Sequence, residues 1–142
     1  MFLNGILGGL VGITAGADQM SPTDAVLIGL IAGVIIVLGV ALIDKLKLDD
    51  PVGAVPVHLI CGIWGTLAVG IFGNLAGWDQ FLKQLAGVGV IGAFCCVFAL
   101  IIFYTIKSTM GLRMDGLSET EGLDIHEHGM DAYAEFGATQ EK

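Results

Sequence analysis

The chain has 142 residues, of which 55% are hydrophobic and 14% charged, and its formal net charge is −8. An ordinary soluble domain carries roughly 25% charged residues, so this composition excludes a soluble globule as well as a chain disordered for lack of apolar residues. The three cysteines lie in apolar runs and the six Lys and Arg residues form no patch, which argues against a disulfide scaffold and against nucleic-acid binding.

The first stretch, residues 1–16, is apolar apart from Asn4 and Thr14. It is shorter than the roughly 20 residues that a helix needs to cross a hydrocarbon core. A signal peptide would begin with basic residues, and no Lys or Arg precedes Asp44. We therefore expect part of a membrane helix that begins in a larger protein.

Three longer apolar runs each predict a membrane helix. They cover residues 25–43, 52–72 and 85–106. Helix-start signals precede the first two runs, as Ser21-Pro22-Thr23-Asp24 and Asp49-Asp50-Pro51. Tyr104 in the last run and Trp78 in the loop before it are expected to be interfacial anchors.

Charges predict the orientation of the transmembrane part, residues 1–113. Two pairs of basic residues follow spans two crossings apart and so share a face: Lys45 with Lys47, and Lys107 with Arg113. The positive-inside rule makes that face cytoplasmic. Residues 114–142 hold eight acidic residues and one base, a net −7, so we expect an acidic cytoplasmic tail. Composition alone equally permits a solvated, disordered terminus.

Glycines recur at every fourth position in two predicted helices, as Gly8, Gly12 and Gly16 and as Gly29 and Gly33. This spacing favours close packing of membrane helices, although glycine is also simply common in such helices. The pattern predicts a tightly packed bundle and no chemical site.

His58 is the one ionisable residue inside a predicted span. Such residues are costly in a membrane and mark a substrate path or a partner. A neutral imidazole offers one donor and one acceptor, which suits ammonia or water, but a structural bond to a neighbouring helix stays open. A metal site with Cys61 lacks further ligands. Helical spacing places Gly62 and Gly65 beside the ring and leaves room there.

Four stretches in this order resemble the ammonium transporter (Amt/MEP/Rh) family. They are Gly9-Leu-Val-Gly-Ile-Thr-Ala-Gly16, Ile43-Asp-Lys-Leu-Lys-Leu-Asp-Asp-Pro51-Val52, Val57-His58 with Gly62 and Gly65, and Glu121-Gly-Leu-Asp124 with Glu127-His-Gly129 and Ala132-Tyr133. The resemblance covers nearly the whole chain but only the C-terminal third of a family member. It implies an all-α, polytopic membrane helix bundle: part of helix eight, helices nine to eleven and the tail of an eleven-helix fold.

The resemblance implies channel-like conduction of ammonia or ammonium through a hydrophobic, histidine-lined pore, for nitrogen uptake at the plasma membrane. His58 matches the second of two stacked pore histidines, Ala54 looks like an inner lining position, and Asn4 is a weaker candidate for that lining. Many members have Gly after this histidine where this chain has Leu59, which affects the local pore width. No cofactor is implied.

The tail resembles family tails, which pack against the neighbouring subunit of a homotrimer and, in many prokaryotic members, meet a PII-type signalling protein. The matching positions are Glu121, Gly122, Asp124, His128, Gly129 and Tyr133. Metal binding by His126 and His128 is a weak alternative. An enzyme is not expected, since no nucleophile and base pair, phosphate loop or carboxylate dyad lies in the spans. The alternative function is a truncated, membrane-anchored regulatory fragment without transport of its own.

Overall fold

The computed structural model describes residues 1–132, and every regular element among them is a helix. The chain divides into two compact units, Met1–Phe94 and Cys95–Lys142. Two of the described helices are long and apolar enough to cross a membrane, α2 (Pro22–Lys45) and α4 (Trp78–Thr109). The expected all-α architecture is therefore found.

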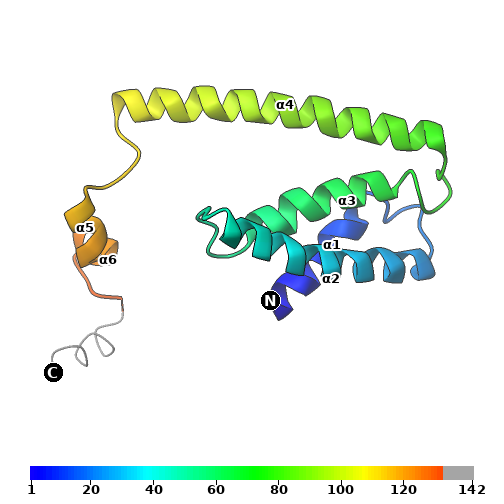
Figure 1. Cartoon of the computed structure of the whole chain (residues 1–142), viewed down its shortest axis with the longest axis horizontal. Coiled ribbons are helices and arrows are strands. Elements are labelled where there is room, and N and C mark those ends of the chain that lie inside the picture. Colours follow the sequence, from blue (N-terminus) through cyan, green and yellow to red (C-terminus); the bar gives the residue numbers. More distant parts are fainter. Residues whose placement is uncertain (133–142) are drawn as a thin grey trace. The chain divides into compact units, whose positions relative to one another are not determined.

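The first unit is built on α1 (Phe2–Thr14), which packs against α2, against the π-helical segment η1 (Val55–Ile60) and against α3 (Cys61–Ala68), the direct continuation of η1 (Figure 1). The centre of this packing is a cluster of four buried residues from α2, η1 and α3. They are Ala32, Ile36, Val57 and Cys61. Small residues on α1 let the other helices approach closely enough to bury this cluster.

Glycines of α1 make that close approach. A Cβ on Gly8 would lie 2.6 Å from Cγ1 of Ile36, and one on Gly65 of α3 would overlap the carbonyl oxygen of Gly12. The predicted packing through Gly8 and Gly12 is thus confirmed. The second predicted ridge is less tightly packed: a Cβ on Gly29 or Gly33 would meet nothing within 4 Å, although a Cβ on Gly9 of α1 would lie 3.9 Å from the Cα of Gly29.

The start of α2 follows the predicted signal. Ser21 is the N-cap, its hydroxyl accepts from the backbone N–H of Asp24, and the Asp24 carboxylate accepts from the backbone N–H of Ser21 at 3.0 Å. This reciprocal capping box satisfies helix N–H groups that have no partner within the helix. With Pro22 at the first helical position, the helix starts three residues before the apolar run and ends two residues after it.

The third predicted span, residues 52–72, is helical only over Val55–Ala68. Gly53 has φ +74°, which ends any helical path before Val55, and Gly70 lies against the backbone of Phe81, where a Cβ could not fit. Trp78 was expected in a loop, but it is the first residue of α4 and stacks on Phe81 with ring centroids 5.6 Å apart. Both differences come from backbone conformation and side-chain contacts that hydropathy does not encode.

The second unit contains two short tail helices, α5 (Gly116–Glu121) and α6 (Leu123–His128), which contact each other (Figure 1). Asp115 caps α5: its Oδ1 accepts from the backbone N–H of Ser118 at 2.8 Å. The described part of the tail is therefore folded locally, rather than irregular as the composition alone would permit.

Candidate functional site

Asp50 closes the N-terminus of the helix that carries His58. Its Oδ1 accepts from the backbone N–H of Ala54 at 2.7 Å, and its Oδ2 accepts from the N–H of Val55 at 2.9 Å. A carboxylate at this end also matches the positive end of the helix dipole. In the sequence, Asp50 is visible only as part of a helix-start signal. The sequence does not predict its two hydrogen bonds to the turn before His58.

Asn4 of α1 contacts the turn between Asp50 and η1. Its Nδ2 donates to the carbonyl oxygen of Val52 at 3.1 Å. A Cβ on the next residue, Gly53, would lie 2.5 Å from the same nitrogen. Asn4, expected to be a pore-lining candidate, is thus half-buried and bonded to the backbone of this turn.

His58 lies on the exposed side of η1, together with Ala54 and Leu59. Its neighbours Pro56 and Val57 are buried, and Val57, which is 2% exposed, packs in the core cluster. Within residues 1–132 the imidazole has no hydrogen-bond partner, so both ring nitrogens are open to a solute. Single π-helical turns occur frequently at functional sites because they change the direction of side chains locally.

The two glycines expected to leave room beside His58 do not both do so. Gly65 is buried against Gly12, and a Cβ on Gly62 would meet only Val11, at 3.9 Å. The expectation assumed a 3.6-residue period from His58 onward, but a π-helical turn bonds residue i to i+5 and breaks that period. Cys61 is buried in the core, and no described group of three His, Cys, Asp or Glu residues could hold a metal ion.

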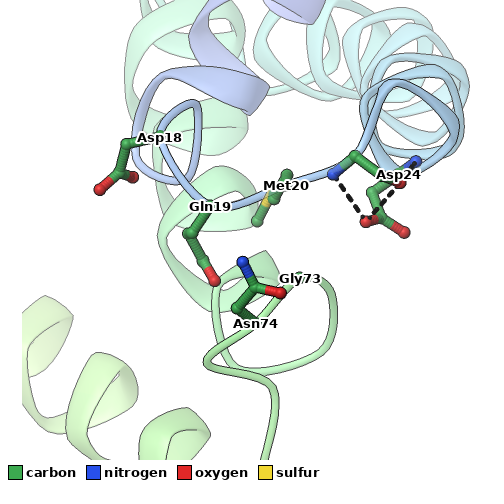
Figure 2. Close-up of a pocket in the computed structure, with 7 residues that line it drawn as sticks. Asp18, Gln19, Met20, Asp24, Gly73 and Asn74 are labelled. Atoms are coloured by element: carbon green, nitrogen blue, oxygen red, sulfur yellow. Dashed lines mark hydrogen bonds between the residues drawn. The ribbon is translucent and has the colours of Figure 1, made fainter.

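A hollow of about 540 Å³ lies at the other end of α2 from Lys45 (Figure 2). Polar groups from two loops line most of it: Asp18, Gln19, Met20, Ser21, Asp24, Gly73 and Asn74. The Asp24 carboxylate is occupied by the α2 cap, and Asp18 points away from Gln19 and Asn74 in Figure 2. Oε1 of Gln19 accepts from the N–H of Leu75 at 2.9 Å, which joins the two loops. The hollow is a loop junction and does not contain His58.

The tail positions matched by the family resemblance are held by local bonds. Asp124 Oδ2 accepts from the backbone N–H of Ala132 at 2.8 Å, and this bond holds the pKa of Asp124 below its usual range. Glu121 Oε2 lies 3.0 Å from Nε2 of His126, a contact between α5 and α6. Side chains of the tail itself thus stabilise the segment around α6.

Two glycines of the tail have left-handed backbone conformations. Gly122, between α5 and α6, has φ +112°, and Gly129, at the end of α6, has φ +67°. His128 is exposed and its charge adds to the lowering of the Asp124 pKa. Tyr133 lies outside the described residues.

The comparisons agree with this architecture. The model of the Ammonium Transporter Family matches residues 1–133. A putative ammonium transporter of Synechocystis sp. is 48% identical over 127 residues, which is 89% of this chain and 28% of that protein. Ammonium transporter Amt2 of Archaeoglobus fulgidus is 38% identical over 157 residues, 99% of this chain and 34% of that protein.

A solved structure, titled Sensor Amt Protein, superposes with a TM-score of 0.82 at 34% identity, over 87% of this chain and 33% of that one. Fold and comparisons together define a polytopic helical membrane protein. The chain belongs to the Ammonium Transporter Family. It spans about a third of the length of the curated relatives it matches.

Proposed function

We propose that the chain takes part in ammonium transport and that His58 is a residue of the conducting path. The observation that carries the proposal is the position of His58 in a member of this family: exposed, unbonded in the described residues, and on a helix whose N-terminus is fixed by Asp50. Ala54 and Leu59 would line the same path, because they share its exposed side.

The chemistry of the ring supports a small hydrogen-bonding solute. A neutral imidazole can donate one hydrogen bond and accept one, and ammonia can do both. The apolar neighbour Leu59, 57% exposed, gives a charged ammonium ion no compensation for lost water, which favours passage of the uncharged molecule. A metal cation gains nothing from the N–H donor of the ring.

The orientation, assembly and regulation belong to the same proposal. Lys45 and Lys47 after α2, and Lys107 and Arg113 near the end of α4, favour a cytoplasmic C-terminus in the plasma membrane. A homotrimer, and a PII-type protein docking on the tail, rest on the family resemblance. The folded tail helices α5 and α6 would present their exposed acidic side chains to either contact.

The test places residues 1–142 behind the amino-terminal two thirds of the Synechocystis relative and measures methylammonium uptake into liposomes. His58→Ala is expected to reduce uptake to the background of empty liposomes. The matched control is Thr105→Ala on α4, because the Thr105 hydroxyl bonds only the Ile101 carbonyl of its own helix. Undiminished uptake by a folded His58→Ala protein would remove His58 from the path.

A further inference from the structure

We propose that Asn4 is a positioning residue for His58, acting through the turn that starts the π-helical segment rather than on the solute. This inference rests on the proposed role of His58 in the path. It joins two segments that are 48 residues apart in the chain, the beginning of α1 and the turn after Asp50.

The first step of the argument is the direction of the Asn4 bond. Only the amide nitrogen of the carboxamide can donate to the carbonyl oxygen of Val52, so this contact fixes which end of the Asn4 side chain faces the turn. An aspartate of the same size would place an oxygen against that carbonyl oxygen. Asn4→Asp is therefore a nearly isosteric way to break the contact.

The second step is the space at Gly53. Its φ of +74° is a conformation that side chains disfavour, and a Cβ there would lie only 2.5 Å from Nδ2 of Asn4, closer than the two atoms can approach. The carboxamide thus fills the place of a side chain at Gly53 while bonding the preceding carbonyl. One side chain of α1 selects the conformation of the turn.

The third step leads from the turn to His58 through consecutive backbone groups. The N–H of Gly53 donates to the Asp50 carbonyl at 3.2 Å, and the Gly53 carbonyl accepts from the N–H of Val57 at 3.1 Å. The Asp50 carboxylate takes the N–H groups of Ala54 and Val55, which lie between these two bonds. These bonds are made by Asp50 and Gly53, which lie on either side of Val52, the residue whose carbonyl accepts from Asn4.

The fourth step compares the two sides of η1. Pro56 lies against α2, where a Cβ on Gly39 would be 3.1 Å from Cβ of Pro56, and Val57 is in the core. These contacts hold the buried side of the helix. Asn4 supplies a polar tertiary contact at the beginning of η1. Loss of Asn4 therefore leaves the buried side of η1 packed but removes the contact that fixes the backbone conformation of the turn before His58.

The primary experiment uses the 142-residue chain in lipid nanodiscs and measures amide hydrogen exchange at Ala54 and Val55 together with the ring signals of His58 by NMR. Asn4→Asp is expected to speed exchange at both amides about fivefold, the loss of roughly one hydrogen bond, and to shift the His58 ring signals. The control Thr14→Val, whose lost hydroxyl bonds only the Leu10 carbonyl of α1, should change neither. Wild-type exchange and ring signals in Asn4→Asp would overturn the inference.

A double-mutant cycle keeps the inference testable if Asn4→Asp folds poorly. Gly53→Ala introduces the methyl group that collides with Nδ2 of Asn4, and in an Asn4→Ala background that collision is absent. The strain of the positive φ is common to both backgrounds and cancels. Gly53→Ala should therefore speed exchange at Ala54 less in the Asn4→Ala background; equal effects in both backgrounds would contradict the coupling.

The transport readout separates positioning from solute binding. In the chimera with the Synechocystis relative, Asn4→Asp is expected to lower the maximal uptake rate and leave the apparent KM for methylammonium unchanged. A raised KM with an unchanged rate would make Asn4 a solute contact and overturn the inference. If His58→Ala leaves uptake intact while Asn4→Asp still changes exchange at Ala54, the proposed function fails and the structural coupling stands.

Discussion

The two long apolar helices, α2 and α4, have similar composition but opposite burial. In α2 five residues in one stripe are buried, namely Ile28, Ala32, Ile36, Gly39 and Ile43, whereas in α4 no described residue is buried. Hydropathy treats both as membrane spans. The stripe of α2 is covered by α1, η1 and α3 of the same unit. Hydropathy alone thus does not identify which residues of a span pack against other helices of this chain.

The largest expected effect is at the contact between α1 and α3. Gly65→Val places a branched side chain against the Gly12 backbone, which cannot rotate away, and should destabilise the first unit by about 3 kcal/mol or more. Gly33→Val makes the same change at a glycine of α2 whose Cβ would meet nothing within 4 Å. It should leave stability within about 0.5 kcal/mol. Unfolding of the chain by SDS in mixed micelles, followed by circular dichroism, measures the free energy of unfolding of both variants. Equal losses of stability would contradict the difference between the two glycine positions.

A smaller effect is expected from the buried stripe of α2. Ile36→Ala removes a core side chain and should cost about 2 kcal/mol, the low end of core truncations, because lipid replaces water as the alternative surrounding. Ile101→Ala on α4 is the matched control, since Ile101 is exposed. The same SDS titration reads both variants; a loss at Ile101 as large as at Ile36 would mean that burial in this chain does not govern stability.

The smallest effect concerns the tail and its pH dependence. The backbone N–H of Ser118, and then its hydroxyl, hold the pKa of Asp115 below its ordinary value. A carboxyl whose folded pKa is lowered stabilises α5 above its unfolded pKa, about 3.9, and loses that contribution as the pH falls through the folded value. NMR of the Leu117 and Ser118 amides should therefore show α5 loosening below about pH 4. Asp115→Asn should remove this dependence while keeping a capping side chain.

The sequence predicts local features of the fold well. The beginning of α2 follows from Ser21 and Asp24, since a capping box involves only neighbours in the chain. The contact through Gly8 and Gly12 follows from small residues at every fourth position. The sequence does not predict that a Cβ on Gly33 would meet nothing, because periodicity identifies a helix face but not whether another helix covers it.

The candidate site was only partly predictable. His58 stands out as the one histidine in a predicted span, and the family resemblance follows from motifs around it. The bond from Asn4 to Val52 and the burial of Gly65 depend on distant parts of the chain coming together. No local pattern specifies the π-helical turn, so the face assigned to Gly65 was wrong.

The π-helical turn also offsets the side-chain directions of α3 from those at the start of η1. Each residue of an α-helix advances the side-chain direction by about 100°, so one extra residue in a turn offsets everything beyond it by that angle. Pro56 faces α2 and Gly65 faces α1 across this offset. A change in the length of this turn by one residue would therefore redirect every side chain beyond it.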